Sequence, residues 1–111
     1  MKNGLYMANI CENTFYIYDK DSDKISKIGE EFTKLFDEEL YGELTYFSEG
    51  VIEGYCESKW TYPKSTLTPL IDKYEPEYFR CISSEPGCGY YSCHIYTDNG
   101  WKDPQYFDLY I

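Results

Sequence analysis

The stretch TFYIYDKDSDKISKIGEEFTKLF, residues 14–36, decides the fold of this chain. Its first five residues are aromatic or β-branched and predict a strand over 14–18. A polar break follows at 19–23, in which Asp21 or Ser22 can cap a helix. Apolar residues then recur at helical spacing, which predicts a helix over about 23–37. The stretch therefore predicts a strand followed directly by an amphipathic helix.

Strand and helix signals alternate along the rest of the chain. Residues 44–47 and 51–60 predict an antiparallel pair, and a short helix capped by Ser65 or Thr66 ends before Pro76. Further strands are expected over 78–83, 89–97 and 106–111, with turns at 85–89 and 98–100. The order is β-α-β-β-α-β-β-β. We expect residues 1–111 to form one α+β domain, a ferredoxin-like plait with both helices on one face of an antiparallel sheet.

Side-chain alternation sorts the strand residues between the two faces of such a sheet. The set expected under the helices is apolar and comprises Phe15, Ile17, Ile52, Cys56, Phe79, Cys81, Tyr91, Cys93, Ile95, Phe107, Leu109 and Ile111. The set expected on the open face comprises Tyr16, Tyr18, Glu53, Tyr55, Glu57, Tyr78, Arg80, Tyr90, His94, Tyr96, Tyr106, Asp108 and Tyr110. Eight of the fourteen tyrosines fall in this second set.

A face rich in tyrosine has two interpretations. Rigid amphipathic rings that lose little rotamer entropy are typical of protein-recognition surfaces. Tyrosine is also a favoured strand residue, and cross-strand aromatic pairs stabilise an exposed sheet. The pattern alone leaves both interpretations open.

The charge of the chain indicates the kind of partner. Ten basic and twenty acidic residues give a net charge of −10, which repels nucleic acid and anionic membranes and attracts basic protein surfaces. Sheets that stack RNA bases surround their rings with lysine and arginine, whereas the neighbours expected here are Glu53, Glu57 and Asp108.

A second acidic group, Asp37, Glu38 and Glu39, follows the first helix. It is either a solvated face or part of a phosphate-like array that occupies a basic groove. The residues predicted to bind the partner are Tyr16, Tyr18, Glu53, Tyr55, Glu57, Tyr90, His94, Tyr96, Tyr106, Asp108, Tyr110, Asp37, Glu38 and Glu39.

Few residues suggest catalysis or metal binding. The single histidine, His94, follows Cys93 on a predicted strand, so the two side chains point to opposite faces and cannot share a metal ion. Carboxylates on the open face could orient His94 as a base, but the spacing singles out no nucleophile. We expect no cofactor, no metal and no enzymatic activity.

Five cysteines, an odd number, argue against a disulfide framework. Three of them, Cys11, Cys56 and Cys81, sit among strand-forming residues as small hydrophobes. The sequence shows neither an apolar run long enough to span a bilayer nor a signal-peptide core, so we expect a cytoplasmic protein.

Three short motifs, in this order, resemble a known family. They are residues 7–13 (MANICEN), residues 58–63 (SKWTYP) and residues 85–90 (EPGCGY). The chain resembles the YubB-like, ferredoxin-fold proteins of plasmids and phages. The resemblance implies the plait fold and a mobile-element origin, and it supplies no functional residues. Small acidic proteins of mobile elements are often inhibitors of host defence, such as anti-CRISPR proteins.

The sequence thus predicts a non-enzymatic inhibitor from a mobile element. Its acidic, tyrosine-rich surface would block a basic nucleic-acid-binding protein or nuclease complex in the cytoplasm of a bacterial host, without contacting nucleic acid or membrane itself. One alternative is a small-ligand-binding protein or enzyme that uses His94 and nearby carboxylates, for which a concave pocket around His94 would be the sign. Another alternative is a homodimer formed through the tyrosine face or the last strand.

Overall fold

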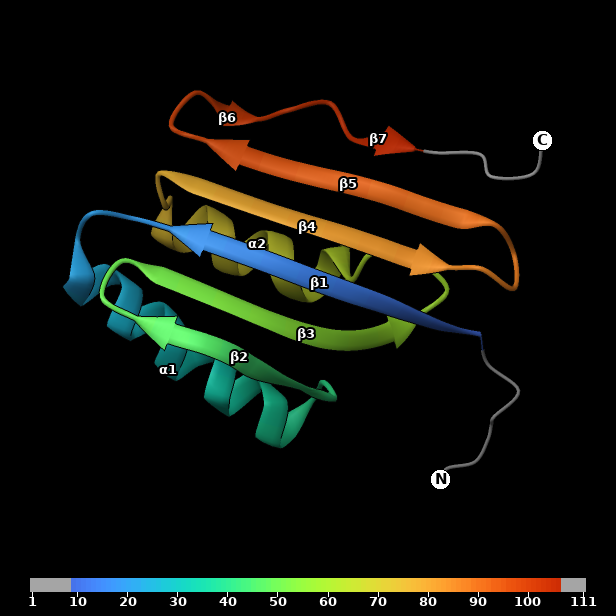
Figure 1. Cartoon of the computed structure of the whole chain (residues 1–111), viewed down its shortest axis with the longest axis horizontal. Helices are drawn as coiled ribbons and strands as arrows, with labels where there is room; N and C mark the ends of the chain where they lie inside the picture. Colours follow the sequence, from blue (N-terminus) through green and yellow to red (C-terminus); the bar gives the residue numbers. More distant parts are fainter. Residues whose placement is uncertain (1–8, 107–111) are drawn as a thin grey trace.

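Two helices pack on a seven-stranded antiparallel sheet in the computed structural model, which describes residues 9–106 (Figure 1). The helices are α1 (Ser22–Glu38) and α2 (Lys64–Tyr74). The strands are β1 (Ile10–Tyr18), β2 (Gly42–Ser48), β3 (Val51–Lys59), β4 (Tyr78–Glu85), β5 (Tyr90–Thr97), β6 (Gly100–Trp101) and β7 (Gln105–Tyr106). Their order in the sheet is β2-β3-β1-β4-β5-β6, with β7 also paired to β5.

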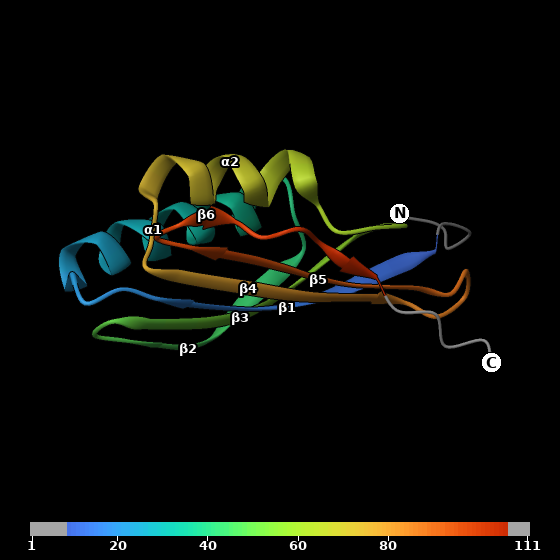
Figure 2. The same ribbon diagram turned by 90° about the horizontal axis from the view of Figure 1, so that it is seen from above.

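Both helices lie on one side of the sheet, which confirms the predicted α+β arrangement (Figure 2). Asp21 caps α1 as expected, accepting hydrogen bonds from the N–H groups of Asp23 and Lys24. The predicted cap of α2 is wrong, because α2 begins at Lys64 and Ser65 and Thr66 lie inside it. The short strand β6 was not predicted. Only Tyr106 of the predicted last strand is described, and residues 107–111 lie outside the described residues.

The core forms between the helices and the inward-facing residues of the central strands. The Phe15 ring of β1 stacks on Phe32 of α1, with ring centroids 4.6 Å apart. It also lies over Gly54 of β3, where a Cβ atom would overlap the ring, so this glycine makes room for the aromatic pair. The predicted core residues that are buried here are Phe15, Ile17, Ile52, Cys56, Phe79 and Cys81.

The predicted orientation of β5 is wrong. Tyr96 lies opposite Phe79 and His94 lies opposite Cys81 in the β4–β5 register. Residues directly opposite each other share a face, so Tyr90, His94 and Tyr96 face the helices while Tyr91, Cys93 and Ile95 face away. Aromatic or apolar residues occur at both the odd and the even positions of this strand. The alternation of side chains therefore could not show which set faces the helices.

The indole of Trp101 explains why Tyr96, and not the predicted Ile95, lies in the core under β5. Its ring centroid lies 5.2 Å from that of Tyr96 and 5.8 Å from that of Phe79, both in edge-on contact. Such edge-to-face packing suits aromatic rings and is not available to an aliphatic side chain. Tyr96 is therefore 8% exposed.

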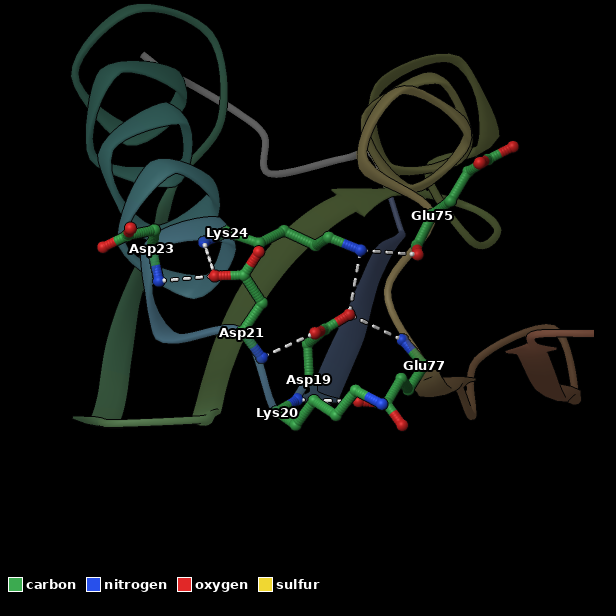
Figure 3. Close-up of polar contacts among 7 residues, drawn as sticks. All are labelled: Asp19, Lys20, Asp21, Asp23, Lys24, Glu75 and Glu77. Carbon is green, nitrogen blue, oxygen red and sulfur yellow. Dashed lines mark hydrogen bonds and ion pairs between the residues drawn. The ribbon is translucent and has the colours of Figure 1, made fainter.

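A buried carboxylate joins the two connections that lead into α1 and out of α2 (Figure 3). Asp19 is 2% exposed and accepts hydrogen bonds from the N–H groups of Asp21 (2.8 Å) and Glu77 (3.0 Å). It also forms a 3.0 Å ion pair with Lys24, whose Nζ atom donates to the carbonyl of Glu75 at 3.2 Å. Asp19 thus fixes the end of β1 to both helices and to the start of β4.

The ionised form of Asp19 stabilises the fold. Burial raises the pKa of this carboxyl, but the Asp21 N–H, the Lys24 ammonium and the Glu77 N–H lower it by more, so the pKa lies below its usual value. A carboxyl whose pKa is lower in the folded state contributes stability that is present above the unfolded pKa. That contribution is lost as the pH falls through the folded pKa.

We expect Asp19→Asn to lower the free energy of unfolding by about 1–3 kcal/mol at about pH 7, because the amide cannot pair with Lys24 and mismatches the surrounding donors. Urea unfolding at a series of pH values should show this deficit shrinking as the pH falls from the usual aspartate pKa of about 4 through the lowered pKa of folded Asp19. The exposed Asp103→Asn is the control and should change stability by less than about 0.5 kcal/mol. A deficit that stays constant into acid would contradict this role of the charge.

Candidate functional site

The open face is the side of the sheet that the helices leave uncovered (Figure 2). The strand registers place on it the residues Ile10, Glu12, Thr14, Tyr16, Tyr18, Glu43, Tyr46, Ser48, Val51, Glu53, Tyr55, Glu57, Lys59, Tyr78, Arg80, Ile82, Ser84, Tyr91, Cys93, Ile95 and Thr97. Six of these described residues are tyrosines, where the sequence predicted eight.

The structure places five of the predicted partner-binding residues on this face as expected. They are Tyr16, Tyr18, Glu53, Tyr55 and Glu57. They come from two neighbouring strands, β1 and β3, in which polar and apolar residues alternate clearly. The alternation rule therefore succeeds where one parity of a strand is unmistakably apolar.

Four predicted residues lie on the helix side instead. Tyr90, His94 and Tyr96 follow the orientation of β5 described above. Tyr106 pairs with Ser92, which faces the helices, and its ring lies 6.1 Å from that of Tyr90 and 6.3 Å from that of His94. Their predicted place on the open face is wrong. The remaining strand residues of the prediction, Asp108 and Tyr110, lie outside the described residues.

The acidic group at the end of α1 belongs to the helix layer. Asp37, Glu38 and Glu39 are all exposed, at the last turn and the C-cap of the helix. Glu39 lines an open groove of about 790 Å³ at the end of the sheet, and Glu57 of the open face lines the same groove. The two predicted acidic groups are therefore connected around one end of the molecule.

Several open-face residues were missed by the sequence analysis. Tyr46 and Ile82 are 52% and 50% exposed, and Ile10 is 43% exposed. Tyr91 was placed in the core, and the acids Glu12 and Glu43 were not assigned to the face. A β2–β3 register that includes the bulge between Leu44 and Tyr46 would have identified Tyr46, but no sequence signal marks that bulge.

Aromatic and cationic side chains meet at the centre of the open face. The Tyr16 ring contacts the edge of Tyr78, with centroids 6.0 Å apart. The guanidinium carbon of Arg80 lies 5.4 Å from the centre of the Tyr16 ring, within the range of a cation–π contact. These contacts hold the central rings in place.

Carboxylates surround this centre on the β2–β3–β1 side. Tyr55 donates a 2.6 Å hydrogen bond to Glu57, and burial together with this carboxylate raises the pKa of Tyr55, so its phenol remains a donor. Glu12 and Glu57 stand directly opposite each other on neighbouring strands. Like charges at opposed positions destabilise a sheet. The face therefore retains an arrangement that costs stability.

We expect Glu12→Gln to raise the free energy of unfolding by roughly 0.2–1 kcal/mol, because it removes the repulsion between Glu12 and Glu57 without changing side-chain size. Chemical denaturation at low salt measures the gain, and added salt should reduce it because exposed charges are screened. Glu30→Gln, on the exposed side of α1, is the matched control and should leave stability nearly unchanged. An equal or lower stability for Glu12→Gln would contradict the repulsion.

His94 does not share a face with the carboxylates proposed to orient it. It faces the helices and stacks on Tyr62, with ring centroids 3.8 Å apart. Glu53 and Glu57 lie on the other side of the sheet. The predicted combination of His94 with these acids is therefore wrong.

The five cysteines all lie among the described residues and are unpaired, with Cys11, Cys56 and Cys81 buried as predicted. Within residues 9–106, no three histidine, cysteine, aspartate or glutamate side chains are arranged to hold a metal ion. Neither helix of this part of the chain has the length and hydropathy that a membrane crossing requires.

Comparisons of the chain with protein-family models, with curated proteins and with solved structures found no match. The resemblance to YubB-like proteins therefore stays a prediction, and the function is argued from the site.

Proposed function

We propose that this chain is a non-enzymatic inhibitor that docks its open face on the basic surface of a nucleic-acid-binding protein. The observation that supports the proposal is the composition of the open face. It combines tyrosine rings and exposed apolar side chains with an excess of carboxylates, on the side of the sheet away from both helices.

The rings and apolar side chains would supply contact area. Tyr46, Ile82 and Ile10 are each more than two-fifths exposed on this face. Tyrosine is enriched at protein interfaces because it buries a large ring while its hydroxyl keeps a hydrogen-bond partner. The open face therefore carries aromatic and apolar side chains that an interface could bury.

The charges favour a basic protein over a nucleic acid as the occupant. The acids Glu12, Glu43, Glu53 and Glu57 outnumber the bases Lys59 and Arg80 on this face. The net charge of −10 acts in the same direction over longer distances and would speed association with a cationic surface. A phosphate backbone would meet repulsion from the same groups.

We further propose that the fold is a ferredoxin-like plait. The order β2-β3-β1-β4, with α1 connecting β1 to β2 and α2 connecting β3 to β4, is the order expected of a split β-α-β pair, to which β5, β6 and β7 are added. The family resemblance suggests an origin in a phage or plasmid. A bacterial defence protein as target and the host cytoplasm as location belong to the same proposal.

Charge reversal on separate surfaces tests the proposal. The open-face variant Glu12→Lys/Glu53→Lys, the helix-end variant Glu38→Lys/Glu39→Lys and the control Glu30→Lys/Asp103→Lys each raise the net charge by the same amount. Proteins captured by the immobilised chain from nuclease-treated bacterial lysate are identified, and the dissociation constant of each purified candidate is measured against all variants. We expect the open-face variant to weaken binding about tenfold or more, and the control to bind like the wild type.

The proposal also requires that the captured protein be basic and that the wild-type chain compete with nucleic acid for it. Capture that is unaffected by the open-face variant would exclude the open face as the docking surface. Sedimentation of the free chain addresses the homodimer, because a monomer should appear as a single 13.2 kDa species. A stable dimer that the open-face variant dissociates would instead show that the face binds a second copy.

A further inference from the structure

A second concave site lies on the helix side of the sheet, between α2 and the edge formed by β5, β6 and β7. It is a cavity of about 300 Å³, which is at the lower end of the range for small-molecule sites. The side chains used below come from four separate segments: Tyr62 and Lys64, His94, Trp101 and Lys102, and Tyr106. The cavity shares none of its lining residues with the open face.

The walls of this cavity are aromatic and held in place. Tyr62 is 5% exposed, stacks on His94 at 11° between ring planes, and pairs its hydroxyl with Thr68 at 3.0 Å. The indole N–H of Trp101 donates to Asp72 of α2 at 2.7 Å. These contacts fix the rings of Tyr62 and Trp101 in the absence of a ligand. Little conformational entropy of these side chains therefore remains to be lost when a ligand binds.

One buried polar atom of His94, a residue of the cavity wall, lacks a partner. Nδ1 of His94 is buried and makes no hydrogen bond to any described residue. A buried polar atom without a partner is costly, and native structures usually provide one. Burial, followed by the charge of Lys64, lowers the pKa of His94, so the imidazole is neutral and one of its nitrogens can accept a hydrogen bond.

The charge of the cavity is opposite to that of the chain. Lys64 and Lys102 line it, no carboxylate does, and neither ammonium group forms an ion pair with any residue from 9 to 106. Elsewhere in this part of the chain only Lys24 and Lys73 form ion pairs, so Lys64 and Lys102 are distinguished by their place at the cavity and not by lacking a partner acid. In a protein of net charge −10, two lysines beside aromatic walls select an anion that carries a ring.

We propose that this cavity binds a small molecule in which a flat aromatic ring carries a phosphate or carboxylate group. The ring packs against Trp101 and the Tyr62–His94 pair. The anion lies near Lys64 and Lys102. This inference stands on the cavity alone and does not depend on the function of the open face.

Tryptophan fluorescence tests the inference directly. The chain has two tryptophans, so Trp60→Phe leaves Trp101, a lining residue of the cavity, as the only reporter. The probes are adenosine 5′-monophosphate, indole-3-acetate and neutral adenosine. Binding of all three is measured by calorimetry. Binding of adenosine and its monophosphate, which do not fluoresce, is also followed by the fluorescence of Trp101. We expect saturable binding of one of the two anions with a dissociation constant of about 1 mM or below, and binding of adenosine about tenfold weaker or worse than that of its monophosphate.

Variants separate binding from folding. Lys64→Glu/Lys102→Glu should weaken anion binding about tenfold or more, whereas Lys27→Glu/Lys34→Glu on α1 makes the same charge change and should leave it unaltered. His94→Phe keeps an aromatic ring beside Tyr62 and removes the buried nitrogen that has no partner, so it should keep anion binding and should not lower thermal stability.

Each outcome decides the inference. Binding of the monophosphate identifies the anion as a phosphate, and binding of indole-3-acetate alone identifies it as a carboxylate. Either result supports the site if the lysine variant abolishes it. Failure of both anions to bind at about 10 mM, equal binding of adenosine and its monophosphate, or binding that survives the lysine variant would overturn it.

Discussion

The structure depends on β1 being hydrogen-bonded along both of its edges. β1 pairs with β3 on one side and with β4 on the other, in continuous antiparallel registers. Because β1 has a neighbouring strand on each side, its backbone N–H and C=O groups form hydrogen bonds within the sheet. Its side chains alternate between the helix side and the open face of the sheet. Because residues directly opposite each other share a face, the alternation along β1 is passed from strand to strand across the sheet. Phe15 thereby places Gly54 and Cys81 under the helices, and Tyr16 places Glu53 and Arg80 on the open face.

The end of β1 determines where the helices can lie. Asp19 is the first residue after the strand, and its carboxylate holds the start of α1 through Asp21 and Lys24. The same carboxylate holds the residue before β4 through the N–H of Glu77. An ionised group that is almost fully buried is tolerated only when its hydrogen-bonding capacity is used, as it is here. Both helices are therefore held on one side of the sheet, and the other side of the sheet can contact water or a partner (Figures 2 and 3).

The sequence predicted the parts of the fold in which one physical signal outweighs the others. In β1 and β3 one parity is apolar and the other polar or tyrosine-rich, so the faces were assigned correctly for Tyr16 and Glu53. β5 reads YYSCHIYT, with rings or apolar groups at both parities, and its orientation follows from its register with β4 and from packing against Trp101. Neither the register with β4 nor the packing against Trp101 can be recognised from the residues of β5 alone. The sequence offered a pocket around His94 only as the sign of an alternative function, and it could not supply the lining of the cavity beside α2, because those residues come from four segments that only the tertiary fold brings together.

The orientation of His94 changes the chemistry that this residue can perform. On the open face it would have had carboxylates beside it, which is the arrangement that orients and charges a general base. On the helix side its neighbours are Tyr62 and Lys64, and the lowered pKa keeps it neutral. No described carboxylate lines the cavity, so an imidazolium formed during proton transfer would have no stabilising partner there. A neutral ring that stacks on Tyr62 at the cavity wall is suited to packing against a ligand. The geometry therefore favours binding over acid–base catalysis at this residue, in agreement with the recognition role proposed for the open face.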